Sequence, residues 1–227
     1  SIQDENPYLI PESQDSALVD IMTFCDSEEY LDLPHSNFNL FLSQRVILKC
    51  FYMGTRGNED VRLEKKEWEW LHDGIMTAED ELDGIQYETN IQDVINKMMA
   101  KEKNPTNSEL NFNELHLVLG RRGTKTILAS VISSYEAYKL LTINDGDPHA
   151  YYGLPDDDLI LILNAALSTV QAGLLFEQTE ARVRNSKFFK GKIANSTTSE
   201  IRFFTKADLR KKASDPSIEI RGSVRIR

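Results

Sequence analysis

Cysteine is scarce in this chain. The 227 residues include only Cys25 and Cys50, too few for a disulfide framework, and no Cys/His cluster has the spacing of a zinc site. No apolar run approaches the roughly 18 residues that a membrane-spanning helix requires. The acidic N-terminus also lacks the basic-then-apolar layout of a signal peptide. These absences exclude a disulfide-built secreted scaffold and predict a protein of the cytoplasm without membrane association.

Positive charge is missing from the first 36 residues, which hold nine carboxylates and no Lys or Arg. The formal net charge of the whole chain is −10, yet residues 184–227 hold twelve Lys/Arg and four Asp/Glu. The overall balance argues against a nucleic-acid partner, whereas the basic segment would allow one face to meet phosphate groups. The alternative is that these basic residues simply alternate on solvent-exposed strand faces.

The residue pattern changes along the chain and predicts three parts. Residues 1–36 form an acidic N-terminal arm, residues 37–110 form a helical part, and residues 111–227 form an α/β core. In the core, expected strands and helices alternate at 114–119, 125–141, 159–163, 168–183, 201–205, 217–221 and 223–226. Such alternation predicts an α/β fold with a mostly parallel sheet flanked by helices, preceded by a helical N-terminal extension.

The stretch from Leu115 to Thr126, LHLVLGRRGTKT, is the most informative motif. It predicts an apolar strand, a short glycine-containing loop and a Lys-Thr pair that opens a helix, as in a phosphate-binding loop. The usual pattern is Gly, four residues, Gly, Lys and Ser or Thr. Here Leu119 and Thr124 occupy the two Gly positions, and the glycines are displaced by one place to Gly120 and Gly123.

Each residue of this loop has a chemical reason to be there. Lys125 can reach the β- and γ-phosphates, beside the N–H groups of the loop and helix N-terminus. Thr126 offers the hard oxygen ligand that Mg²⁺ prefers. The loop glycines allow close backbone approach, and Arg121 and Arg122 can donate paired hydrogen bonds to phosphate. The alternatives are an ordinary helix start and a solvated loop.

Other polar residues are weaker candidates. Ser43 is predicted to cap a helix from Gln44 to Met53. The amide of Gln44 can both donate to and accept from the edge of adenine, with Phe41 as a possible cover for the ring. Asn164, Ser168 and Gln171 follow the strand predicted at 159–163, at the end where such sheets bind ligands. Plain helix capping by Ser168 is the alternative. No predicted strand ends in the Asp-Glu pair that a P-loop hydrolase uses to hold Mg²⁺ and orient water.

Together these features resemble the ATPase domain of the large terminase subunit of tailed bacteriophages, over residues 37–227. Gly120, Arg121, Lys125 and Thr126 match that family's phosphate loop, whereas Thr124 replaces its usual Gly. Gln44 looks like the family's adenine-recognising glutamine. Residues 151–155 and 186–189, together with the residues around Asn164 and Gln171, are similar to segments that follow the phosphate loop in many members.

The resemblance implies an ATPase that uses ATP and Mg²⁺ to translocate double-stranded DNA into a procapsid. In such a motor, Lys125 would bind the β/γ-phosphates, Thr126 the Mg²⁺ and Gln44 the adenine. Arg121 would contact the γ-phosphate or transmit its loss, and Arg122, Gly123 and Thr124 would complete the loop.

The implied partners are the portal protein, the small terminase subunit and further copies of the chain in a ring, in the host cell cytoplasm. The Asp-Glu strand and a nuclease domain are expected beyond Arg227, so we expect weak hydrolysis by this chain alone. Two alternatives stay open: a nucleotide-responsive DNA-binding or assembly module without hydrolysis, and a helicase-like P-loop translocase.

Overall fold

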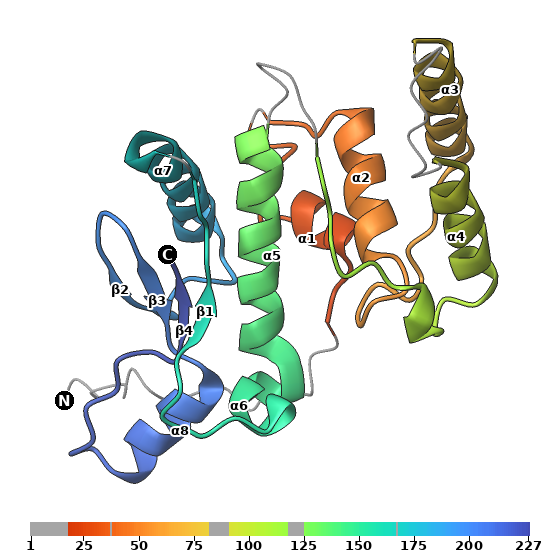
Figure 1. The fold of residues 1–227 in the computed structure, drawn as a ribbon. Helices are drawn as coiled ribbons and strands as arrows, with labels where there is room; N and C mark the ends of the chain where they lie inside the picture. Colours follow the sequence, from red (N-terminus) through yellow and green to blue (C-terminus); the bar gives the residue numbers. More distant parts are fainter. Residues whose placement is uncertain (1–17, 37, 82–90, 118–124, 167) are drawn as a thin grey trace. The chain divides into compact units, whose positions relative to one another are not determined.

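The computed structural model describes residues 18–36, 38–81, 91–117, 125–166 and 168–227 (Figure 1). It divides into two compact units, which we describe separately. One unit, the helical unit, comprises Val19–Asp26 and the described residues from 33 to 117. The other, the sheet unit, comprises Ser27–Asp32 and the described residues from 125 to 227.

The helical unit is built from short amphipathic helices. They are α1 (Ile21–Asp26), α2 (Leu42–Tyr52), α3 (Lys65–Glu81), α4 (Ile91–Lys103) and the 3₁₀ turn η1 (Ser108–Leu110). Val46 of α2, Met53 directly after this helix, and Met98 of α4 are buried together with Val61 and Leu63. Apolar residues at helical spacing on α2 and α4 therefore form this core, as the sequence predicts.

The start of α2 differs from the prediction that Ser43 caps a helix beginning at Gln44. The helix begins at Leu42, and the capping position is Phe41, whose side chain has no acceptor. Instead, Gln44 reaches back, and its Oε1 accepts a hydrogen bond from the Phe41 N–H at 2.8 Å. One otherwise unpaired donor of the first turn is thereby satisfied from inside the helix.

A buried ion pair joins α2 to α3. Lys49 Nζ donates to Glu67 Oε2 at 2.7 Å, and both side chains are almost fully buried. The same carboxylate oxygen accepts the N–H of Glu64 at 2.7 Å, in the first turn of α3. Because removal of either partner would strand a buried charge, this pair fixes how the two helices pack.

The sheet unit contains four helices and four strands. They are α5 (Lys125–Gly146), α6 (Pro148–Tyr152), β1 (Ile160–Ile162), α7 (Thr169–Asn185), β2 (Ile193–Ser196), β3 (Ile201–Phe203), α8 (Lys206–Ser214) and β4 (Val224–Ile226). The predicted helix and strand alternation is therefore present from α5 onward, with the antiparallel pair β2–β3 inserted in it.

The sheet is smaller and more mixed than the predicted mostly parallel sheet. The strand order is β1-β4-β3-β2. β1 pairs with β4 in parallel, but β3 pairs antiparallel with both β2 and β4. The antiparallel pairing of β2 with β3 follows from the short connection between them. Consecutive strands joined by a tight turn run antiparallel, whereas parallel neighbours need a crossover.

The continuous apolar run at 159–163 is typical of a buried parallel strand, but among the described residues only one face of β1 is covered. Ile160 and Ile162 share the parity of Asn164, which hydrogen-bonds to Ser133 of α5, so this face lies against the helix. The leucines at 159, 161 and 163 alternate with them and are exposed, Leu163 to 65%. β1 is an edge strand with one open face, so a continuous apolar run did not mean burial on both sides.

The chain reverses sharply after α5. Ile143, Asn144 and Asp145 leave helical geometry, and Asn144 and Asp145 have φ of 50° and 53°. Asp147 then caps α6 by accepting the N–H of Ala150 at 3.0 Å. The residue pattern at 144–148 predicts a turn. The structure confirms it, because Asn and Asp tolerate the left-handed region.

Three predicted strands have other outcomes. Residues 114–117 have no strand partner in the structure, and 118–119 lie outside the described residues. Residues 217–221 are irregular, and strand β4 begins only at Val224. Thr205, predicted as a strand end, instead caps α8 by accepting the N–H of Asp208 at 3.0 Å.

Candidate phosphate-binding site

The site predicted from the sequence begins where α5 begins. Lys125 is the first residue of this helix and is exposed, whereas Thr126 behind it is partly buried. The first turn of α5 contains no acidic residue. The backbone N–H groups of a first helical turn and the positive end of the helix dipole favour an anion at this position.

The loop itself lies outside the described residues. This holds for five predicted ligands of the nucleotide: Gly120, Arg121, Arg122, Gly123 and Thr124. Their roles stay predictions, as do the roles of Lys125 and Thr126 toward phosphate and Mg²⁺. No group of three or more His, Cys, Asp or Glu in the described ranges is arranged to hold a metal ion.

Helix α5, which begins at Lys125, is packed tightly along its length. Leu128, Val131 and Tyr135 are almost completely inaccessible, and the buried positions surround most of the helix circumference. A helix that is apolar on nearly all sides is a central helix. In the sheet unit α5 contacts β1, β4, α6, α7 and α8. Lys125 is therefore presented from the best-packed element of this unit.

A hydrogen bond joins α5 to the end of β1. Ser133 Oγ donates to Asn164 Oδ1 at 3.0 Å, and the Asn164 Nδ2 is buried with no hydrogen-bond partner among the described residues. Ser168 caps α7, since its Oγ accepts the N–H of Gln171 at 3.3 Å. Three residues were predicted near this strand end. Asn164 lies against α5, and Ser168 caps a helix, which was the alternative given for it. The Gln171 side chain is exposed.

One cation near the start of α5 was not predicted from the sequence. Arg182 of α7 donates from Nε to Ser130 Oγ at 2.7 Å. The signal for this contact was absent from the sequence, because the two residues are 52 positions apart and only the packing of α7 on α5 joins them.

Gln44 lies in the helical unit and is 3% exposed. Its amide oxygen accepts the Phe41 N–H, so in this arrangement the carbonyl end serves the helix start. Phe41, predicted as a possible cover for adenine, is 62% exposed. The predicted contact of Gln44 with adenine stays a prediction.

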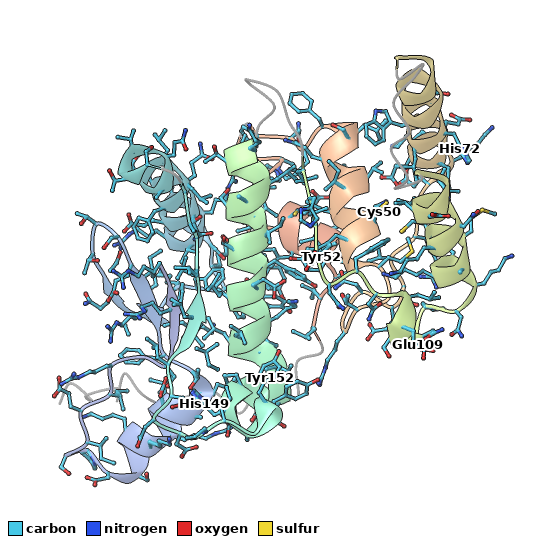
Figure 2. The ribbon with its side chains drawn as sticks, viewed as in Figure 1. Cys50, Tyr52, His72, Glu109, His149 and Tyr152 are labelled. Carbon is cyan, nitrogen blue, oxygen red and sulfur yellow. The ribbon has the colours of Figure 1, made fainter. Side chains whose placement is uncertain are left out.

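The helical unit also contains an apolar pocket of about 740 Å³ that sequence reasoning missed. Its walls come from α2, α3, α4 and the segment 112–116, and include Phe51, Trp70 and Phe112. Cys50 of α2 (Figure 2) lies in the wall. Burial raises the pKa of its thiol to about 12, so Cys50 is no nucleophile at neutral pH.

The basic segment 184–227 is largely neutralised by partners within the sheet unit. Lys211 pairs with Asp156 at 2.8 Å, and Lys187 pairs with Glu28 at 2.6 Å. Lys206 and Arg210 both contact Asp145 and lower the pKa of that carboxyl group. Lys212 donates to two backbone carbonyl groups. These residues lie on α8 or in a turn, so the alternative of basic side chains alternating on strand faces is wrong for them. Contact of this segment with phosphate groups stays a prediction.

His149 is a buried polar residue with a structural role. It lies on α6 (Figure 2) and is buried. Its Nε2 is 2.7 Å from the Asp158 carbonyl oxygen, so the ring ties α6 to the segment that leads into β1.

No helix within the described ranges has the length and apolar character needed to cross a membrane.

Comparison with known proteins gives one result. No curated protein and no solved structure matches the chain. A family model, described as the N-terminal P-loop domain of the uncharacterized protein MJ0330, matches residues 55–224. This range includes the phosphate loop and Lys125 but not Gln44. The match spans well over half of the chain, and the chain therefore belongs to this family of P-loop domains.

Proposed function

We propose that this chain binds ATP with Mg²⁺ and is the ATP-binding part of a motor that packages double-stranded DNA, like the large terminase subunit of tailed bacteriophages. The observation that carries nucleotide binding is the position of Lys125, which opens the central helix of a chain that belongs to a P-loop family. P-loop domains use this position for a lysine at the β/γ-phosphates. The packaging role rests on the terminase-like loop, in which Gly120 and Arg121 precede Lys125 and Thr126.

In this proposal each residue of the site binds the part of the nucleotide or the metal ion that matches its chemistry. Lys125 binds the β- and γ-phosphates, and Thr126 offers its hydroxyl to Mg²⁺. Arg121 and Arg122 add guanidinium groups to the phosphate end, while Gly120, Gly123 and Thr124 shape the loop. Gln44 recognises adenine after its amide turns from the Phe41 N–H toward the base.

A second candidate, a nucleotide-responsive module without hydrolysis, is favoured by the strand ends. β1 is followed by Leu163 and Asn164. The C-terminal end of this parallel strand therefore carries no carboxylate at the position where a hydrolase would orient water. We therefore expect tight binding and weak turnover from this chain.

The proposed partners are double-stranded DNA, the portal protein, the small terminase subunit and further copies of the chain in a ring. In the basic segment, Lys190 and Arg227 are the side chains without an ion-pair or hydrogen-bond partner in the sheet unit. DNA contact by this segment would depend on these cations and on exchange of existing ion pairs, and it would weaken steeply with salt.

The test is calorimetric titration of the chain with ATP and Mg²⁺. We expect Lys125→Ala to weaken binding by about tenfold to a hundredfold, since a charge-assisted hydrogen bond contributes roughly 1.5–3 kcal/mol. Lys139→Ala is the matched control, because Lys139 lies on the same helix and pairs with Glu136. Equal affinity in the wild type and Lys125→Ala, or no binding by the wild type, would reject nucleotide binding at this loop.

Turnover and DNA assays separate the remaining alternatives. ATP binding without hydrolysis, in the chain and in a longer version that continues past Arg227, would favour the module without hydrolysis. Strand separation of duplex DNA would favour a helicase-like translocase, and ATP-dependent DNA uptake by procapsids would support the packaging motor.

A further inference from the structure

The outer edge of strand β1 presents backbone groups that the sheet does not use. β1 lies at one end of the strand order, with β4 as its neighbour (Figure 1). Its backbone hydrogen bonds to the segment around β4 come from alternate residues, namely Ile160, Ile162 and Asn164. Successive residues of a strand direct their N–H and C=O groups to opposite edges, so those of Leu159, Leu161 and Leu163 point away from β4. In the described part of the sheet unit, no strand pairs with this edge.

This edge also lacks the features that usually prevent strand addition. Edge strands of natural proteins are commonly protected by charged side chains, proline or a bulge. Residues 159–163 contain no charged residue and no proline, and β1 pairs with β4 without a register shift. The three leucines of the segment are all exposed. The edge is therefore chemically suited to pair with a further apolar strand.

The sequence of the strand is complementary to itself. Residues 159–163 read Leu-Ile-Leu-Ile-Leu, which is the same in both directions. In an antiparallel pair of two copies with Leu161 opposite Leu161, Leu159 of each copy lies opposite Leu163 of the other. The residues with outward backbone groups then form the hydrogen-bonded pairs of an antiparallel ladder. Leucine meets leucine and isoleucine meets isoleucine across the two strands, and such apolar cross-strand pairs stabilise a sheet.

Charge favours this antiparallel orientation over a parallel one. Residues 156–158, which precede β1, are three aspartates. A parallel pair in register would place them beside the same aspartates of the second copy, and like charges directly opposite destabilise a sheet. The antiparallel pair places them opposite residues 164–166, which are Asn, Ala and Ala. At that end of β1 lies Arg227, whose N–H donates to the Ile162 carbonyl oxygen at 3.0 Å and whose side chain is exposed. This cation complements the aspartates of the second copy.

We propose that the outer edge of β1 is the contact surface of a homodimer, in which β1 pairs antiparallel with β1 of a second copy about Leu161. The contact joins the sheets of the two copies into one. It is isologous and closes at two copies, so it differs from the head-to-tail contacts of a ring. It uses no residue of the phosphate site, so it holds or fails independently of the proposed nucleotide binding.

Analytical ultracentrifugation of the whole chain over a range of concentrations measures this association. We expect a monomer–dimer equilibrium, and we expect Leu161→Pro to weaken dimerisation by about tenfold or more, because two hydrogen bonds at the centre of the contact are lost. Within one copy this proline removes no hydrogen bond of the sheet, since the Leu161 N–H points away from β4 and edge strands accept proline in that position. Ile218→Ser is the control, because Ile218 is an equally exposed aliphatic residue in another segment of the sheet unit; it should dimerise as the wild type does.

Cysteine cross-linking tests the register in a chain in which Cys25 and Cys50 are replaced by Ala. Leu161→Cys should form a disulfide between copies under mild oxidation, because the Cα atoms of a hydrogen-bonded antiparallel pair are about 5.5 Å apart, within the range of a disulfide. Leu159→Cys alone should not, since its counterpart lies about 14 Å away along the strands. A mixture of the Leu159→Cys and Leu163→Cys chains should cross-link.

Three outcomes would overturn the proposal. They are a monomer at all concentrations, wild-type dimerisation of Leu161→Pro, and cross-linking of Leu159→Cys as efficient as that of Leu161→Cys. A monomeric chain would mean that the edge stays open or is covered by another partner. Thermal unfolding shows whether Leu161→Pro is folded, and if it is not, the cross-linking pattern alone decides.

Discussion

Lys101 of α4 is a buried cation with no counter-ion among the described residues, and its replacement should stabilise the helical unit. The residue is 0% exposed, and its Nζ has no hydrogen-bond partner in the part of the chain that the structure describes. The ammonium lies 5.0 Å from the centre of the Phe112 ring, and Lys97, one turn earlier, lies 4.4 Å from the same ring. A ring face compensates only part of what an ammonium loses when it leaves water.

The magnitude follows from the pKa of the amine. Burial, and then the charge of Lys97, lower the pKa of Lys101 from the ordinary value of 10.5 to about 8. Each pKa unit corresponds to about 1.36 kcal/mol, so the protonated amine opposes folding by about 3 kcal/mol below pH 8. Because the folded pKa lies below the unfolded one, this opposition decreases as the pH rises from 8 and is gone above 10.5.

We therefore expect Lys101→Met, which keeps the side-chain length, to raise the free energy of unfolding by up to about 3 kcal/mol at pH 7. The advantage over the wild type should shrink between pH 8 and 10.5. Urea unfolding at a series of pH values measures both effects, with Lys103→Met on the exposed side of the same helix as control. A destabilised Lys101→Met, or an advantage that does not change with pH, would show that the amine is paired or hydrated and would refute this reasoning.

Two further predictions concern the packing of each unit. Glu67→Ala leaves the buried ammonium of Lys49 without its carboxylate and should lower the free energy of unfolding by about 3–5 kcal/mol. Replacement of both residues by Met should lower it far less. Equal losses of stability in the two proteins, measured by urea unfolding, would contradict this prediction. Gly222→Ala should destabilise the sheet unit, because Gly222 has a φ of 82° and a Cβ there would lie 2.8 Å from the Phe203 carbonyl oxygen. Gly153→Ala is its control, since Gly153 has a φ of 65° but no atom lies within 4 Å of an added Cβ. Similar decreases in the unfolding temperature of the two variants would show that the contact with Phe203 has no effect.

The sequence predicted the local elements well where periodicity and turn chemistry act within a few residues. The helix that opens at Lys125, the turn at Asn144–Pro148 and the cap at Ser168 are properties of neighbouring residues, and the structure contains all three. The start of α2 was placed too late because the Gln44 side chain, rather than a Ser43 hydroxyl, satisfies the free backbone donor.

The arrangement of the sheet was predicted less well, since partners in a sheet are chosen over long separations. The apolar run around β1 predicted a buried parallel strand, but a run of apolar residues does not show how many faces of the strand are covered. Its exposed leucines show that the second cover is absent from the described part of the sheet unit. Likewise, the charge of residues 184–227 gave no indication that Asp145, Asp156, Glu28 and Glu180 would neutralise much of it.

By itself, then, the sequence determined the phosphate-binding motif, the central helix behind it and the alternation of helices and strands, because each depends on the chemistry and spacing of adjacent residues. Only the tertiary structure decided which cations are neutralised, that Gln44 serves a helix start, that Lys101 is buried with no polar partner among the described residues, and that Arg182 lies beside the first turns of α5. These outcomes depend on contacts between residues far apart in the chain, and burial changes the energy of a charge far more than its local sequence can show.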